Sequence, residues 1–213
     1  MRHFIGAAMA VTLVVGAAAS KLNVMDPSGK KVGTATYSFI QGGEKLSTRL
    51  ILTMTEQGAN VTMDMTNVYS SAGNPMTQLV KISAALQGNK FESSAKATFA
   101  GRKATVVTTA MGKTETKSAT APGSVADQSI VWIGGRIPAV GTKSTAYEFN
   151  PMNVTWKKTV STYHGLRTVK LGSRSVSAHV LTSTQGDENT KVYFTAKGDL
   201  IKLESKQFNL IQQ

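Results

Sequence analysis

The chain has 213 residues, no cysteine and a formal net charge of +12. This length is enough for one sizeable core, and the absence of cysteine excludes disulfides and lipid attachment at a cysteine. The positive charge favours anionic partners, of which an anionic membrane surface is one candidate.

The first nineteen residues have the layout of an export signal. Met1-Arg2-His3 is a short basic start, residues 4–15 form an apolar run, and Ala17-Ala18-Ala19 supplies the small residues that signal peptidase reads. The run is short for a membrane span, which needs about 20 apolar residues, and a retained N-terminal anchor is the alternative. We therefore expect a cleaved signal peptide at residues 1–19 and a single periplasmic or secreted β-domain at residues 20–213. An exported chain meets little nucleic acid, so no nucleic-acid partner is expected.

Short alternating runs separated by turn residues make up most of the remaining chain. In residues 46–55, Leu50, Leu52 and Met54 alternate with Ile51 and Thr53, and this period of two indicates a pleated strand. Gly, Asp and Asn between the runs tolerate the positive φ of tight hairpins. The predicted strands are residues 32–40, 46–55, 60–69, 77–86, 90–99, 103–110, 113–120, 142–149, 154–163, 167–171, 177–184, 190–196 and 200–207.

The alternation breaks once, between residues 121 and 141. Ser124 followed by Asp127 is a plausible start for a helix, and Gly134-Gly135 is a plausible end. We therefore expect one short helical segment near residues 124–134. The rest of the chain, with turn signals about every 10 to 13 residues, is typical of an all-β sandwich or barrel.

Several stretches resemble exported bacterial proteins of unknown function. They are Lys31-Val32-Gly33-Thr34-Ala35-Thr36-Tyr37, Pro138-Ala139-Val140-Gly141, Tyr147-Glu148-Phe149-Asn150-Pro151 and residues 192–204. Those proteins are similar in layout to the half-open β-barrel of the lipoprotein carriers and related carriers of hydrophobic ligands. The resemblance implies an all-β fold made of a single highly curved antiparallel sheet with a short helical plug. It carries no catalytic residues.

Few residues of the mature chain offer catalytic or metal chemistry. His164 and His179 are widely spaced, so a zinc site would need carboxylates from distant strands. The acidic cluster Asp187-Glu188-Asn189 lacks the alternating oxygen ligands of a calcium loop and reads as a hairpin tip. The sequence therefore predicts no metal, no cofactor and no enzyme. An enzyme would be favoured only if one of the histidines met an acid in a cleft.

Apolar and aromatic residues at and after the crossing form the candidate ligand site. Trp132 lies in the irregular segment, so we expect it to be buried as one wall of an apolar cavity, with Tyr147, Phe149 or Trp156 beside it. The simpler alternative for most of these residues is a place in the core. The candidate ligand-binding residues are Ile130, Trp132, Ile133, Tyr147, Phe149 and Trp156, and the candidate contacts to an anionic head group are Lys157, Lys158, Arg167 and Lys170.

These features lead to two hypotheses. The first is an exported envelope protein that holds an apolar or amphipathic small molecule, such as a lipid, in a half-barrel cavity. The second is a non-enzymatic structural or interaction module of the cell envelope that docks a protein or an anionic polysaccharide through a sheet edge or a basic face. A cavity would favour the first hypothesis, and a dry core with an exposed edge strand would favour the second.

Overall fold

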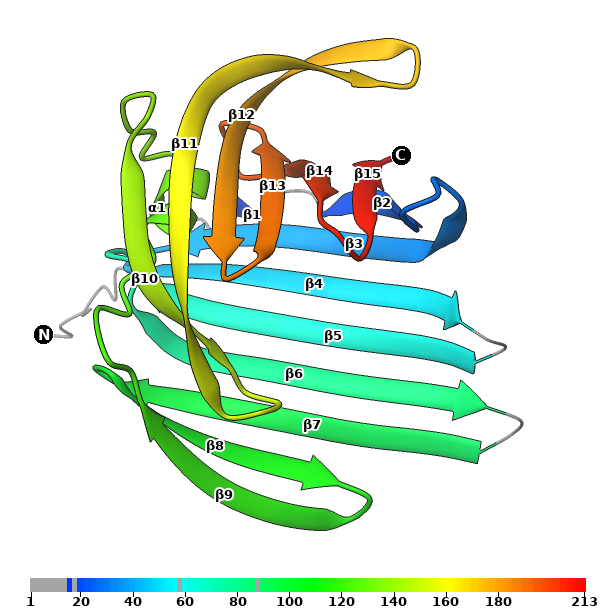
Figure 1. Cartoon of the computed structure of the whole chain (residues 1–213), viewed down its shortest axis with the longest axis vertical. Coiled ribbons are helices and arrows are strands. Elements are labelled where there is room, and N and C mark those ends of the chain that lie inside the picture. Colours follow the sequence, from blue (N-terminus) through cyan, green and yellow to red (C-terminus); the bar gives the residue numbers. More distant parts are fainter. Residues whose placement is uncertain (1–14, 17–18, 57–58, 87–88) are drawn as a thin grey trace, which may run out of the picture.

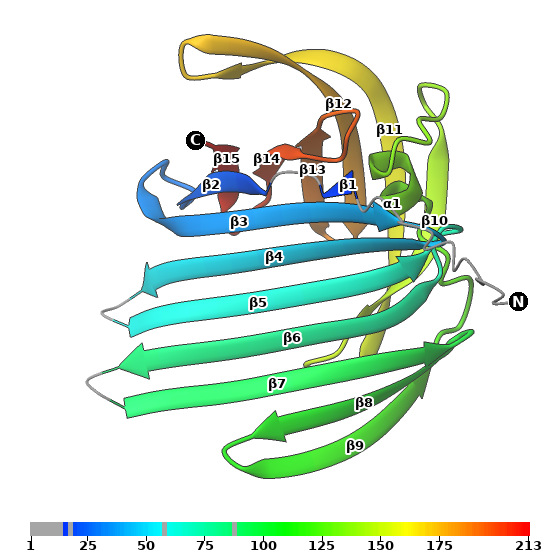
Figure 2. The ribbon, with the colours of Figure 1, turned by 180° about the vertical axis from the view of Figure 1, so that it is seen from behind.

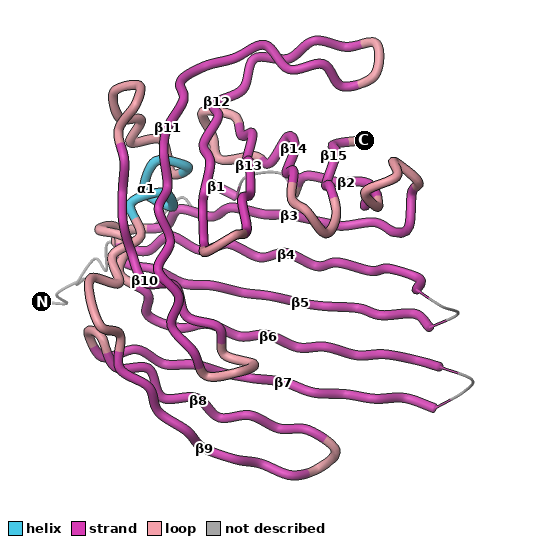
Figure 3. The backbone as a smooth tube through the Cα atoms, in the orientation of Figure 1, coloured by secondary structure: helices cyan, strands magenta, loops and turns pink. Residues whose placement is uncertain are grey.

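The computed structural model describes residues 15–16, 19–56, 59–86 and 89–213, and almost all of them belong to one bent sheet (Figures 1 and 3). Every strand pairing is antiparallel, in the order β10-β11-β12-β13-β14-β15-β2-β3-β4-β5-β6-β7-β8-β9, with β1 paired to β3 beside this path. Strands β10 and β9 are the two edges, so the sheet is not closed. The predicted fold class, one highly curved antiparallel sheet with a short helical segment, is confirmed.

The strands are β1 (Val15–Gly16), β2 (Ser20–Met25), β3 (Lys31–Gly42), β4 (Lys45–Glu56), β5 (Ala59–Ser70), β6 (Pro75–Leu86), β7 (Asn89–Ala100), β8 (Lys103–Ala110), β9 (Lys113–Thr120), β10 (Lys143–Asn150), β11 (Thr155–Leu171), β12 (Arg174–Gln185), β13 (Glu188–Phe194), β14 (Leu200–Glu204) and β15 (Asn209–Gln212). The single helix of the described residues is α1 (Gln128–Ile133). None of the described helical residues forms a segment long and apolar enough to cross a membrane.

Side chains alternate between an inner, concave face and an outer face. Residues in register across β4, β5 and β6 share the inner face, as in the rows Leu52–Met63–Ile82 and Leu50–Met65–Val80. The outer face carries polar residues such as Asp64 and Lys81, which lie opposite each other on β5 and β6. Figure 2 shows strands β3 to β9 from behind. This division follows from the period of two that the sequence shows.

Three buried clusters cover parts of the inner face. One joins β2, β14 and β15 to β3 and β4 through Leu22, Leu52 and Leu210. In the second cluster, α1 packs on the ends of β3 and β4. In the third, β10 packs on β7 and β8. Between these clusters, the inner side chains of β5 and β6 are less covered, and Met63, Met65 and Ile82 remain half-buried.

The helix begins later than the sequence predicted. Asp127, not Ser124, is the N-cap, because its carboxylate accepts a hydrogen bond of 2.8 Å from the backbone N–H of Ser129. The end at Gly134 is as predicted. Figure 3 shows α1 beside β10 and β11, at one end of the sheet.

The predicted turn at His164-Gly165 is wrong. The two runs around it form one long strand, β11, with a bulge between Tyr163 and Gly165. Gly165 has a φ of 86°, and a Cβ there would crowd Val140, so glycine lets the strand pass this point without ending.

Three strands, β1, β2 and β15, were not predicted. The run predicted over residues 200–207 ends at Glu204, where the Ser205 hydroxyl accepts hydrogen bonds from the N–H groups of Gln207 and Phe208 and turns the chain into β15. Strand β2 pairs with β15 and β3. Most of the predicted signal peptide (residues 1–14 and 17–18) lies outside the described residues, and Val15–Gly16 forms β1.

Candidate functional site

Two adjoining cavities lie on the inner face, between strands β5 and β6 and the hairpin of β10 and β11. They have volumes of about 150 Å³ and about 280 Å³ and share Gln78, Glu148 and Phe149 in their linings. We call them together the concave groove. Their combined size is at the lower end of the roughly 300–1,000 Å³ typical of small-molecule sites.

The larger cavity is the apolar part of the groove. Its floor is made by side chains of β5 and β6, and its opposite wall by the turn after β10. The apolar lining residues are Met63, Met65, Val80, Ile82, Phe149, Pro151 and Met152. Unbranched methionine side chains adapt to different shapes, so this surface suits a flexible apolar ligand.

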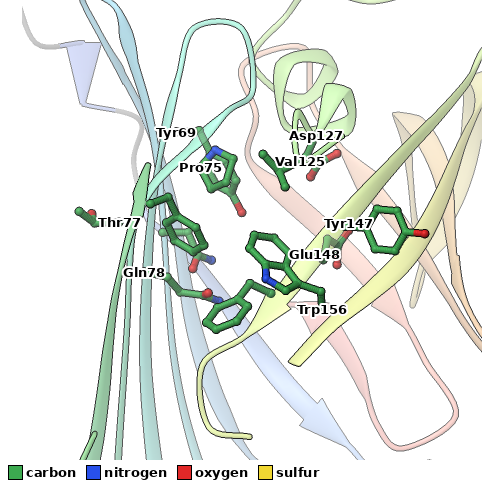
Figure 4. Close-up of a pocket in the computed structure, with 12 residues that line it drawn as sticks. Tyr69, Pro75, Thr77, Gln78, Val125, Asp127, Tyr147, Glu148 and Trp156 are labelled. Atoms are coloured by element: carbon green, nitrogen blue, oxygen red, sulfur yellow. The ribbon is translucent and has the colours of Figure 1, made fainter. Parts of the chain in front are cut away.

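The smaller cavity is the polar part of the groove, and Figure 4 shows its lining. The Trp156 indole lies at the centre, with Tyr69 and Gln78 on one side and Asp127 and Glu148 on the other. No Lys or Arg lines this cavity. The polar part of the groove is therefore acidic in a chain whose net charge is +12.

Three aromatic rings form the wall between the polar part and strands β7 and β8. Phe149 and Trp156 have ring centroids 4.8 Å apart, and Phe99 stands edge-on to both at 5.7 and 5.8 Å. The small inner side chains of Ala97 and Ala104, which are fully buried, leave room for these rings. The packing holds Trp156 in one orientation at the cavity.

Two buried side-chain atoms in the described part of the chain have no hydrogen-bond partner, and both belong to residues of the polar part. They are Asn67 Oδ1 and Trp156 Nε1. The amide nitrogen of Asn67 is engaged, because it donates to Thr48 Oγ1 at 3.4 Å. A buried polar group without a partner costs about 1–3 kcal/mol, so an acceptor for Trp156 and a donor for Asn67 would be stabilising here.

The two carboxyls of the polar part are shifted toward their neutral forms. Burial raises the pKa of Glu148 to about 7, the charge of Asp127 acts in the same direction, and a hydrogen bond with Thr159 opposes them. Burial also raises the pKa of Asp127, although its hydrogen bond with Ser129 opposes the shift. The site can therefore hold or release a proton near neutral pH.

The turn between β5 and β6 positions Asp127. The backbone N–H of Asp127 donates to the carbonyl of Gly73 at 2.9 Å, and Gln128 Nε2 donates to the carbonyl of Ala72 at 3.0 Å. Gly73 has a φ of 82°, and a Cβ there would collide with the carbonyl oxygen of Asp127. Only glycine allows this close approach.

The structure divides the predicted ligand residues into two groups. Tyr147, Phe149 and Trp156 line the polar part of the groove, and the Tyr147 ring extends away from its centre (Figure 4). Ile130, Trp132 and Ile133 are not among the lining residues of the groove. They belong to α1, where Ile130 and Ile133 pack with the cluster around Phe39 and Leu46.

Trp132 is buried, as predicted, with 5% of its surface exposed. Of its predicted aromatic neighbours, Phe149 and Trp156 form ring pairs elsewhere. The ring that pairs with Trp132 is that of Tyr163 on β11, with centroids 6.5 Å apart, whereas Phe149 and Trp156 pair with each other and with Phe99. The reason is that α1 lies on β3 and β4, at a distance in the sheet from β7 and β8.

The four predicted basic residues are also separated. Lys157 lines the apolar part of the groove, opposite Glu148 in the register of β10 and β11, but forms no ion pair with it. Lys158 is exposed on β11. Arg167 and Lys170 line another depression, formed by β11 to β14.

Both histidines of the predicted mature chain form hydrogen bonds with hydroxyl groups. His179 Nδ1 lies 2.7 Å from the Tyr163 hydroxyl, and His164 Nε2 lies 2.9 Å from Thr182 Oγ1. These contacts lack the carboxylate that would favour the enzyme hypothesis. In the part of the chain that the structure describes, no three His, Cys, Asp or Glu residues are placed to hold a metal ion.

Sequence reasoning missed Asn67, Asp127 and Glu148 as site residues. Asn67 had a usable signal, because it falls in step with Val61, Met63 and Met65 on an apolar strand face. Glu148 had no such signal in the sequence, because its position between Tyr147 and Phe149 is that of a solvent-facing residue in an alternating strand.

Comparisons with known proteins identify the fold. No protein-family model and no curated protein matches the sequence. Among solved structures, the chain is similar to a β-barrel-like protein of a domain of unknown function, DUF1849, from Brucella abortus. The identity is 11%, the TM-score is 0.60, and the match covers 90% of this chain and 92% of the other. The resemblance to barrel-like proteins of unknown function is therefore confirmed at the level of the fold.

Proposed function

We propose that the protein is an exported, non-enzymatic envelope protein that binds a small amphipathic molecule in the concave groove. The apolar part of the ligand lies on the surface of Met63, Met65 and Ile82. Its polar end reaches the cavity that contains Asn67 and Trp156. Export rests on the signal-like pattern of residues 1–19.

One observation carries this proposal. The unpartnered polar atoms Asn67 Oδ1 and Trp156 Nε1 belong to two residues that line the polar end of an apolar, methionine-lined groove. A hydroxyl, amine or amide group on the ligand supplies the missing partners, and the adjoining apolar wall accepts the rest of the molecule. The acidic polar end favours a neutral or cationic group over the anionic head group expected from the basic residues.

Native mass spectrometry tests the proposal on protein purified from its own cells without detergent. We expect an additional mass that organic solvent releases as a small molecule. Met63→Gln should lower the occupancy, because it places an amide on the apolar wall. Thr62→Gln is the matched control, since Thr62 is the adjacent residue on the opposite face of β5. A mass equal to the chain alone, with nothing released by solvent, contradicts the proposal.

The interaction-module hypothesis keeps one observation in its favour. Strand β9 is an edge of the sheet, and all of its residues except Ala119 are exposed. An unpaired edge can accept a strand from a partner, although Lys113 and Lys117 discourage such pairing. A ligand-free groove together with a partner bound along β9 would favour this hypothesis.

A further inference from the structure

A basic depression lies outside the concave groove, under the bent part of the β11–β12 hairpin. Figure 1 shows this hairpin curving over β13, β14 and β15. Its side chains Val169 and Leu171 join Ala178, Tyr193 and Ile201 in one buried cluster, which fixes the curved part on the strands below. We call the depression the basic groove. Its volume is about 740 Å³, and it shares no lining residue with the concave groove.

Four cationic side chains line the basic groove, and no acidic residue is among its lining residues. Arg167 and Lys170 come from the hairpin, and Lys191 and Lys202 come from β13 and β14 below it. Arg167 and Lys170 are close in the sequence but far from Lys191 and Lys202, and the bend of β11 brings the two pairs to one groove.

Only one of these cations is neutralised by an ion pair. Lys202 Nζ lies 2.5 Å from Glu204 Oε1, and the Tyr193 hydroxyl donates to the other Glu204 oxygen at 2.8 Å. Arg167, Lys170 and Lys191 form no ion pair with any described residue. The groove therefore keeps a clear excess of positive charge, which attracts an anion.

The floor of the basic groove holds two of the cations in position. The ammonium groups of Lys191 and Lys202 lie over the Tyr193 ring, at 5.2 and 5.7 Å from its centroid. Such contacts reduce the freedom of the long side chains before any ligand arrives. Tyr193 is itself buried and hydrogen-bonded, so this part of the floor is rigid.

We infer that the basic groove binds a phosphate-bearing organic molecule, independently of the concave groove. A phosphate group has several charged oxygens and can accept from Arg167 and from more than one lysine at once. The side chains of Thr168, Thr182 and Asn189 add neutral polar contacts. Val169, Val180 and the Tyr193 ring offer an apolar surface to the organic part. The phosphate belongs either to a soluble ester or to the head group of a phospholipid.

Two binding measurements on the mature protein test the inference and separate the two sources. One is calorimetric titration with inositol hexakisphosphate, and the other is co-sedimentation with phosphatidylcholine vesicles with and without phosphatidylglycerol. The test variant is Arg167→Gln/Lys191→Gln. The control variant, Lys90→Gln/Lys113→Gln, removes the same charge from exposed positions on β7 and β9.

We expect saturable binding in at least one measurement, weakened about tenfold or more in the test variant and less than about twofold in the control. Binding of inositol hexakisphosphate alone assigns a soluble ligand, and binding of phosphatidylglycerol vesicles assigns a lipid head group. Equal weakening in both variants would show attraction to net charge only and overturn the inference. Absence of saturable binding in both measurements would overturn it as well.

Discussion

The Glu148 carboxyl gives the polar end of the concave groove its most distinctive chemistry. It lies beside Asp127, and both half-buried acids have a raised pKa because the protein around their carboxyls excludes water. Tyr69 lines the same cavity from β5, and burial together with the charges of the two acids raises the pKa of its hydroxyl. Lys157 faces Glu148 across the strand pair without forming an ion pair. Because the Glu148 carboxyl has a pKa of about 7, a ligand group that donates a hydrogen bond to it competes with a proton near neutral pH.

This burial predicts how stability depends on pH. The pKa of Glu148 is about 7 in the folded protein against an ordinary value of 4.5. The unfolded chain therefore loses its proton first, and the free energy of unfolding falls as the pH rises from about 4.5 to 7, by up to about 3 kcal/mol. Urea unfolding of the ligand-free protein at several pH values measures this slope.

Glu148→Gln should flatten the slope and make the protein more stable than wild type at pH 8. Asp127 still contributes with the same sign, so a shallower slope remains. Glu92→Gln is the control, because Glu92 is exposed on β7. An unchanged slope in Glu148→Gln would mean that the Glu148 carboxyl is not desolvated as described.

The turn between β5 and β6 is the element that connects the sheet to the polar end of the groove. The backbone of Gly73 contacts that of Asp127 so closely that no side chain fits between them. Loss of this contact would move the acid that caps α1 and lines the cavity.

Gly73→Ala should destabilise the protein more than Gly101→Ala does. Both glycines have a positive φ, but a Cβ at Gly101 meets open space. Gly101→Ala therefore costs only the backbone strain of about 1–2 kcal/mol. Gly73→Ala adds a collision worth about 1–3 kcal/mol. Denaturant unfolding of both variants measures the difference, and equal losses would contradict the role of the turn.

Strands and turns were predictable from sequence to the extent that they depend on local patterns. The alternation of Leu50, Leu52 and Met54 specified β4, because a strand with one buried face needs that period. The bulge at Gly165 was misread as a turn, because a glycine with positive φ serves both structures. The start of α1 was misplaced since two residues of the segment, Ser124 and Asp127, are both good caps.

The candidate site depends on contacts between distant strands, and these were less predictable. Phe149 and Trp156 were expected at the site and do line the groove. Their partner Phe99 was not expected, because nothing in the local pattern shows that β10 returns to cover β7 and β8. Arg167 and Lys170 were assigned to the same ligand as Trp156, but the bend of β11 carries them to the basic groove.

At the scale of the whole molecule, one open sheet provides two separate surfaces for ligands. The concave groove is lined by residues of β5, β6, β10 and β11, and the basic groove is lined by residues of β11 to β14. The two tryptophans of the chain are placed differently with respect to the concave groove. Trp156 lines it, whereas Trp132 is buried with α1. Each tryptophan can therefore report on its own surroundings.

Fluorescence quenching by bromododecanol tests the central claim, that the concave groove holds an amphipathic molecule. Bromine quenches an indole only at short range, and this neutral alcohol matches both parts of the groove. In Trp132→Phe, where Trp156 is the remaining tryptophan, we expect saturable quenching below the concentration at which the alcohol forms micelles. In Trp156→Phe, the remaining Trp132 should keep its fluorescence. Equal quenching of the two variants, or quenching of neither, would contradict the account.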